Sequence, residues 1–205
     1  MPSPIQQTQA IVLGRKESGE SYWHLNLFSA IDGPLPVLLR KPSAKRSPKL
    51  SIPDLFDQID VQLQGGRQGK SYFVEDLRIL KHNIELAHHY QALIHASQFA
   101  HILWRNLTHA EHFEPIHTLL LQALEAFSQG VRPEVVHLKA LYLFAREEGY
   151  PVREHWIATL PAALAKDAKH ALSNPPNGDQ PPSDKTENLL HLLQHYLKSH
   201  TDILI

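Results

Sequence analysis

The spacing of hydrophobic residues changes once along this chain, near residue 81, and that change limits the folds available to it. Before it, short apolar segments are separated by turn residues, and segments 22–28 and 57–64 place apolar side chains at every second position. Such alternation is typical of half-buried β-strands. Three further strands are predicted at 8–15, 34–41 and 71–80. The first 80 residues are therefore expected to form a sheet of five short strands.

A small closed barrel is the architecture that this strand pattern favours. Five short strands, with the longest connection between the third and the fourth, have the layout of an oligonucleotide-binding barrel, the OB fold. Closure also removes the edge strands that would otherwise expose unpaired backbone groups. An SH3-like barrel has a similar strand content and is the competing topology.

After residue 81 the hydrophobic period becomes 3.6, which predicts α-helices. The predicted helices cover 84–107, 115–129, 133–148, one or two short segments within 152–172, and a last helix that begins at Asp184 or Thr186. On the first of them, Leu86, Tyr90 and Leu93 have the spacing of one buried helix face. The second part of the chain is therefore expected to be a helical bundle.

Two domains follow from this change of period. The predicted fold class is α+β, with a five-stranded OB-fold barrel at residues 1–80 followed by an all-α domain at 81–205. Within the second domain, four of the twelve residues in 173–184 are proline, a composition typical of a flexible linker. The last predicted helix comes after this linker.

A strongly basic segment covers the end of the third predicted strand and the start of its connection to the fourth. It reads RKPSAKRSPK, and its basic residues are Arg40, Lys41, Lys45, Arg46 and Lys49. No acidic residue occurs between Asp32 and Asp54, so no neighbour in the sequence neutralises this charge. Dense positive charge suits nucleic-acid phosphates, because neutralised phosphates release their counterions. We predict that these residues bind DNA together with Arg15 and Lys16 at the end of the first strand, although an ordinary solvated loop has the same composition.

Aromatic side chains in the predicted barrel are suited to stacking on bases. Two pairs of neighbours, Tyr22–Trp23 and Tyr72–Phe73, lie within predicted strands. Because successive side chains of a strand point to opposite faces, one member of each pair is expected outside the barrel. An outside ring is either part of a base-stacking surface or a scattered surface aromatic.

The composition excludes several classes of site. The chain has no cysteine, which rules out disulfides, thiolate zinc sites, iron–sulfur clusters and cysteine nucleophiles. Among the histidines, His191 and His195 have i, i+4 spacing, and His109, His112 and His117 lie close together in the sequence. Neither group contains the glutamate of an HExxH motif, so we expect polar surface rather than a metal site, and no cofactor.

The spacing of acidic, serine and histidine residues does not predict an enzyme. Glu147 and Glu148 are adjacent, so on a helix they point about 100° apart and do not form a catalytic pair. The N-terminal segment lacks the positive region of a secretory signal. No apolar run approaches the roughly 20 residues that span a bilayer. We therefore expect a cytoplasmic protein that does not bind membranes.

The order of these features resembles the RecO family of bacterial recombination mediators. The likeness lies in QAIVLGRKESGES (9–21), LNLFSAIDGPLPVLLRK (25–41), the basic segment up to Lys49, and HLKALYLFAREEGYPV (137–152). The resemblance implies an N-terminal OB barrel that binds and anneals single- and double-stranded DNA during repair, without catalysis, and that helps load recombinase. It also implies that the helical domain binds partners: a RecR-like mediator and the acidic C-terminal tail of single-strand binding protein.

Two features depart from the family pattern. Many members hold zinc with four cysteines after the last of these segments, whereas this chain has no cysteine, so no zinc is expected. Pro42 follows Lys41 where members usually have glycine at the start of the basic loop.

Lys139 lies near the position where a basic residue of the family would meet the carboxylate of the tail, and a solvated helix residue is the competing interpretation.

Two alternative functions remain open at this point. One is a protein–protein adaptor whose barrel no longer binds DNA, and the other is a histidine-based hydrolase.

Overall fold

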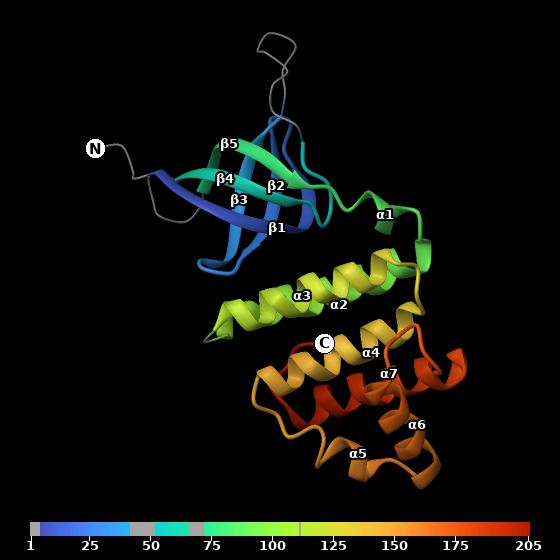
Figure 1. Ribbon diagram of the computed structural model, residues 1–205. Helices are drawn as coiled ribbons and strands as arrows, with labels where there is room; N and C mark the ends of the chain where they lie inside the picture. The colour runs from blue at the N-terminus through green and yellow to red at the C-terminus, as the bar shows by residue number, and fades with distance from the viewer. Residues whose placement is uncertain (1–4, 42–51, 66–71, 111) are drawn as a thin grey trace. The chain divides into compact units, whose positions relative to one another are not determined.

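The computed structural model describes residues 5–41, 52–65, 72–110 and 112–205. The chain divides into two compact units, residues 1–83 and 84–205, which are described separately below (Figure 1). The sequence placed this boundary between residues 80 and 81.

The first unit is a closed five-stranded β-barrel. Its strands are β1 (Ile5–Ser18), β2 (Tyr22–Ser29), β3 (Gly33–Arg40), β4 (Gln58–Gly65) and β5 (Tyr72–Lys81). Around the barrel the order is β1-β2-β3-β5-β4, with β4 returning to β1. All neighbours pair antiparallel except β3 and β5, which pair parallel. The predicted α+β class with an N-terminal five-stranded barrel is therefore confirmed.

The barrel interior is filled by the apolar side chains that the alternation predicted. On β4, Ile59, Val61 and Leu63 are at most 1% exposed, and Leu25 and Leu27 of β2 are fully buried. The core cluster contains Ala10, Val12, Leu25, Leu27, Leu35, Val37, Leu39, Ile59, Val61, Leu63 and Leu77. As expected, alternate residues of each strand point into the barrel.

Strand β1 contains a bulge that changes which of its residues face inward. Val12 pairs with Leu27, whereas Gly14 pairs with Asn26, so Leu13 is the extra residue. An extra residue on one strand reverses the alternation that follows it. Beyond the bulge Arg15, rather than Lys16, therefore lies on the inward side.

The second unit is a helical bundle. Its helices are α1 (Ile84–Ala87), α2 (Tyr90–Asn106), the 3-10 turn η1 (Leu107–His109), α3 (Phe113–Ser128), α4 (Pro133–Glu147), α5 (Trp156–Thr159), α6 (Ala162–Ser173) and α7 (Ser183–His200). Helix α4 is central, because it packs against α2, α3, α6 and α7 (Figure 1). Its Val135, Leu138 and Leu141 are fully buried.

The first predicted helix is interrupted. The sequence predicted one helix over 84–107, but α1 ends at Ala87 and α2 begins at Tyr90. The break changes the phase of the helix, so α2 buries a face that includes Ala92, Ala96 and Phe99. Tyr90, which was expected on the buried face, is 72% exposed.

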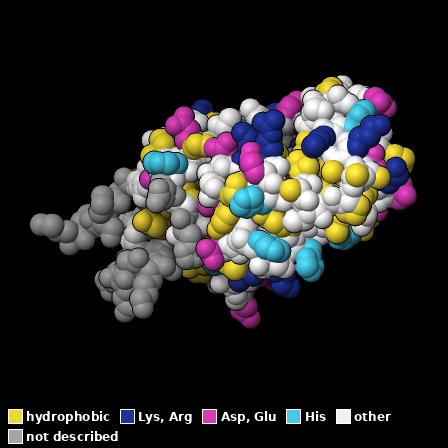
Figure 2. All heavy atoms as spheres, turned by 90° about the horizontal axis from the view of Figure 1, so that it is seen from below, with side chains coloured by type: hydrophobic (Ala, Val, Ile, Leu, Met, Phe, Trp, Pro, Cys, Tyr) yellow, Lys and Arg dark blue, Asp and Glu magenta, His cyan; other side chains and the backbone are white. Residues whose placement is uncertain are grey.

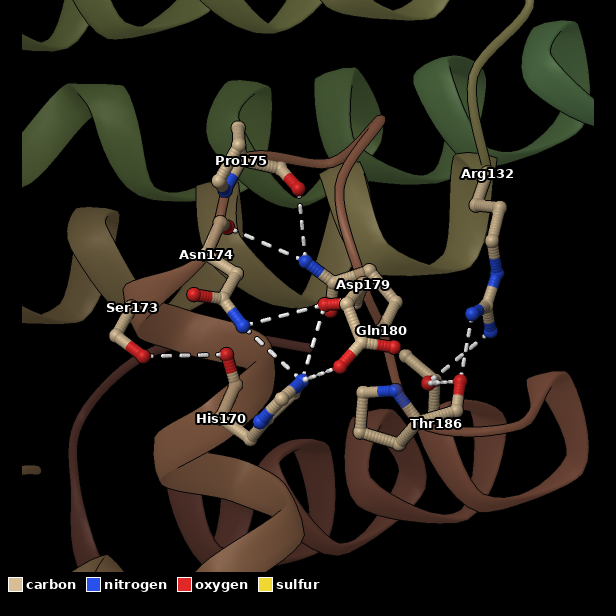
Figure 3. A network of polar contacts seen from close by, with 9 residues as sticks. Arg132, His170, Ser173, Asn174, Pro175, Asp179, Gln180 and Thr186 are labelled. Carbon is tan, nitrogen blue, oxygen red and sulfur yellow. Dashed lines mark hydrogen bonds and ion pairs between the residues drawn. The ribbon is translucent and has the colours of Figure 1, made fainter.

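The segment between α6 and α7 is held by hydrogen bonds, whereas the sequence predicted a flexible linker over residues 173–184. The Asn174 amide donates to the Asp179 carbonyl at 3.2 Å, and the Gln180 amide donates to the Pro175 carbonyl at 2.9 Å (Figure 3). Arg132, at the start of α4, donates to the carbonyl of Pro181 at 2.6 Å. These bonds fasten the proline-rich segment to the bundle, and α7 packs on α4 and α6.

Candidate nucleic-acid interface

The residues predicted to bind DNA divide into three groups. Lys45, Arg46 and Lys49 lie outside the residues that the structure describes. Of the four that it describes, Lys16 and Arg40 point away from the barrel interior. Arg15 and Lys41 point to the inward side at the ends of β1 and β3.

Lys16 and Arg40 lie on the outer face formed by β1, β2 and β3. Strand pairing places Lys16 beside His24, and Arg40 beside Tyr22. Both cations are exposed, and among the described residues neither has an ion pair. Their charge is therefore available to an anion in solution.

An aromatic pair lies on the same outer face. The rings of Tyr22 (β2) and Phe73 (β5) meet edge to face, with centroids 5.9 Å apart. Their sequence neighbours Trp23 and Tyr72 pack instead against the barrel core. The expectation that one member of each aromatic pair lies outside is thus confirmed, and Arg40 is the strand partner of the outer Tyr22.

His24 adds no positive charge to this face near neutral pH. Burial and the adjacent Lys16 ammonium both lower the pKa of His24 below its usual value of 6.5. The imidazole is therefore neutral at pH 7 and is available for hydrogen bonding. The fixed charge of the described part of the face comes from Lys16 and Arg40.

Arg15 and Lys41 are already occupied by groups of the barrel itself. The Arg15 guanidinium lies 5.2 Å, and the Lys41 ammonium 4.8 Å, from the centroid of the Trp23 ring. Arg15 also pairs with Asp54 at 3.6 Å, and Lys41 pairs with Glu17 at 3.5 Å. These two cations are thus held by neighbouring segments of the barrel, which strand alternation alone did not reveal.

In the helical unit, Lys139 holds the end of α6. Its ammonium donates to the carbonyls of Leu172 at 2.8 Å, Asn174 at 2.7 Å and Ala171 at 3.4 Å. A cation is stabilised there by the carbonyls left free at a helix C-terminus. Burial lowers the pKa of Lys139. Lys139 is therefore not a freely solvated helix residue, and its contact with an acidic tail stays a prediction.

At least two open grooves lie among the described residues of the helical unit. One, of about 350 Å³, is bounded by α5, α6 and α7 and is mainly apolar, with Trp156, Leu160, Leu164 and Tyr196 in its lining. The other, of about 340 Å³, lies between α2 and α7. Its polar lining includes His95, His101, Glu187 and His191.

The histidines do not converge on a metal site in the described part of the chain, where no group of three potential ligands is found. His191 and His195, which the sequence paired, line different grooves. In Figure 2 the histidine side chains are spread over the face that is shown. The side chain of His109 is not among those described.

Sequence reasoning missed a pair of histidines in the bundle. The Nδ1 atoms of His95 (α2) and His137 (α4) lie 3.1 Å apart, and His137 is fully buried. Burial, and secondarily the charge on His95, lower the pKa of His137 to about 3. Its Nε2 atom finds no hydrogen-bond partner among the residues that the structure describes. No spacing rule connects residues so far apart in the sequence, so no local signal could have found this pair.

Among the helices of the described residues, none combines the length and the hydrophobicity needed to cross a membrane. Comparison with models of known protein families gives no match for this chain, and no curated protein matches it.

Proposed function

We propose that this protein is a non-catalytic DNA-binding mediator of recombinational repair, similar to the RecO family, that binds and anneals DNA strands. The observation that carries the proposal is the outer face of β1, β2 and β3. There two cations that have no ion pair within the described residues, Lys16 and Arg40, lie with the aromatic pair Tyr22–Phe73 on the barrel that leads into the basic segment 40–49.

The topology supports an OB fold for this barrel. The order β1-β2-β3-β5-β4 and the parallel β3–β5 pair differ from a simple up-and-down meander, in which all neighbours are sequential and antiparallel. In OB folds the face of strands 2 and 3 and the adjacent loops bind oligonucleotides. Tyr22 and Arg40 lie on the corresponding face of this barrel.

The proposed mechanism needs charge and stacking but no bond breaking. Lys16 and Arg40 neutralise phosphates, and the basic segment adds further cations. Tyr22 and Phe73 stack on unpaired bases, a contact that does not depend on sequence. Neutralising the phosphates of two complementary strands lowers their mutual repulsion, and this lets them anneal.

The helical unit is the proposed site of partner binding. A RecR-like mediator and the acidic tail of single-strand binding protein are the partners, and help in loading recombinase in the cytoplasm is the proposed outcome. The groove beside Trp156 offers an apolar surface for a peptide. Lys139 is a weaker candidate for the tail contact, because its ammonium is bonded to three carbonyls.

Fluorescence anisotropy with single-stranded and double-stranded DNA at several salt concentrations tests the proposal. Replacing Lys16 and Arg40 together by alanine should weaken binding of all sequences alike, because phosphate contacts carry no base information. Because two phosphates are then no longer neutralised, the slope of log K against log salt should fall by about 1.4 for single strands. Arg78→Ala is the control, since this exposed cation pairs with Asp60 on β4.

The adaptor hypothesis makes the opposite prediction for the same experiment. An adaptor would show no DNA binding at low salt, or a weak binding that neither salt nor the Lys16 and Arg40 substitutions change. Either result would remove DNA from the proposed function and leave the grooves of the helical unit as the sites of interest.

A further inference from the structure

Two cations at one end of the barrel share a single aromatic ring. Arg15 and Lys41 both lie within cation–π distance of Trp23, at 5.2 Å and 4.8 Å from its centroid. Like charges on one ring repel each other, so this arrangement requires compensating negative charge. Glu17 and Asp54 supply it through one ion pair each.

The cations and the acids of this cluster differ in how they are held. The side chain of Lys41 is 21% exposed and that of Arg15 is 32% exposed, whereas those of Glu17 and Asp54 are 68% and 78% exposed. The cations are also fixed without the carboxylates, because Arg15 donates to the carbonyl of Pro53 at 2.9 Å and lies over Trp23.

The same holds for Lys41, which donates to the carbonyl of Gly19 at 3.3 Å. Its backbone N–H donates to the carbonyl of Ser21 at 2.8 Å, which fastens the residue at the end of β3. Loss of a carboxylate would therefore leave each cation in place with its charge uncompensated.

The position of the cluster connects it to the DNA-binding proposal. Lys41 directly follows Arg40, and both belong to the basic segment that ends at Lys49. The cluster itself carries two positive and two negative charges, so it contributes no net attraction to a phosphate. Its acids are the more exposed members and would be the first groups that an approaching polyanion meets.

We propose that Glu17 and Asp54 hold down the DNA affinity of the barrel by neutralising Lys41 and Arg15. This inference rests on the proposed DNA-binding function and concerns the regulation of that same surface. A phosphate must compete with a carboxylate for each cation. Exposed ion pairs are weak enough for such competition. Lys41 and Arg15 therefore pair with carboxylates in the free protein and with phosphates when DNA is bound.

The test compares Glu17→Gln, Asp54→Asn and the double variant in binding a fluorescein-labelled oligodeoxythymidylate. Asp54→Asn keeps an oxygen that can accept the hydrogen bond from the Leu55 amide, as Asp54 Oδ1 does at 2.9 Å. Each substitution should raise affinity by about two- to fivefold, the range that corresponds to releasing an exposed ion pair. The salt slope should steepen by about 0.7 for each cation that gains a phosphate.

Glu75→Gln is the matched control. Glu75 is an exposed acid on β5 that has no ion pair within the described residues, and its neutralisation changes the net charge by the same amount. An equal gain in all three single variants would reflect net charge alone and would overturn the inference. Thermal melts of each variant establish that the barrel is intact.

The inference and the function on which it rests fail in different ways. If the Lys16 and Arg40 substitutions weaken binding but the Glu17 and Asp54 substitutions leave affinity and salt slope unchanged, the inference is overturned and the function stands. If wild type and the double acid variant both fail to bind DNA at low salt, both are wrong.

Discussion

The buried pair His95–His137 makes a prediction about the stability of the helical unit as a function of pH. In the unfolded chain a histidine has a pKa of 6.5, whereas burial lowers the pKa of His137 to about 3. A group whose pKa is lowered by folding stabilises the fold fully above its unfolded pKa. That contribution is lost as the pH falls from 6.5 toward 3, because the unfolded chain then binds the proton more readily.

The size of this effect at pH 5 follows from the unfolded pKa. A pH of 5 lies about 1.5 units below the pKa of the unfolded histidine. Each unit corresponds to about 1.4 kcal/mol, so the free energy of unfolding falls by about 2 kcal/mol. The result hardly depends on the folded value, provided that His137 remains neutral at pH 5. Burial also lowers the pKa of His95, although Glu134 and Glu187 oppose that shift, so His95 adds to the loss.

Urea unfolding at pH 8 and pH 5 measures this loss in wild type and in a His137→Leu variant. A Trp23→Phe background leaves Trp104 and Trp156, both in the helical unit, as the fluorescent reporters. Leucine removes the titrating group together with the buried Nε2 atom while filling most of the space. Wild type should lose about 2 kcal/mol more than the variant between the two pH values.

The variant also controls for every other titrating residue, including His24 and His117, whose pKa values burial lowers in both proteins. Equal losses in wild type and variant, within about 0.5 kcal/mol, would refute the reasoning. They would mean that His137 accepts a proton in the folded bundle, and hence that the pair at 3.1 Å carries a shared positive charge.

Three further predictions concern single residues that hold the fold. Lys139→Met should destabilise the helical unit by about 1 kcal/mol, because three carbonyls at the end of α6 lose their donor. Urea unfolding measures this loss of stability, and the affinity for DNA should stay unchanged. Asn106→Leu should cost about 1–3 kcal/mol in the same assay, because the side chain donates to the Leu204 carbonyl and accepts from the Leu204 amide; an unaltered midpoint would count against that role. Phe56→Gly should destabilise the barrel by roughly 2–4 kcal/mol, measured by thermal melts. Glycine suits the φ of 67° at this position, but the buried ring contributes more stability than the strain of a left-handed residue costs. A more stable variant would contradict this balance.

The sequence by itself determined the class of each half of the chain. Alternation at 22–28 and 57–64 predicted strands whose inward residues are those found in the barrel core, and the 3.6 period predicted the bundle. Both signals are local, because hydrophobic side chains must lie on one face of whatever element they belong to. The break between α1 and α2 escaped this reasoning, since α1 is a single turn whose few apolar residues, Ile84, Leu86 and Ala87, are too few to show a change of phase.

Only the tertiary structure decided the role of each basic residue in the barrel. The bulge at Leu13 puts Lys16 on the open outer face and Arg15 over Trp23. Strict alternation without the bulge would place Lys16 inside and Arg15 outside. The bonds of Lys139 and the His95–His137 contact likewise join residues far apart in the sequence. Register and long-range packing arise between elements, so the pattern within one element does not contain them.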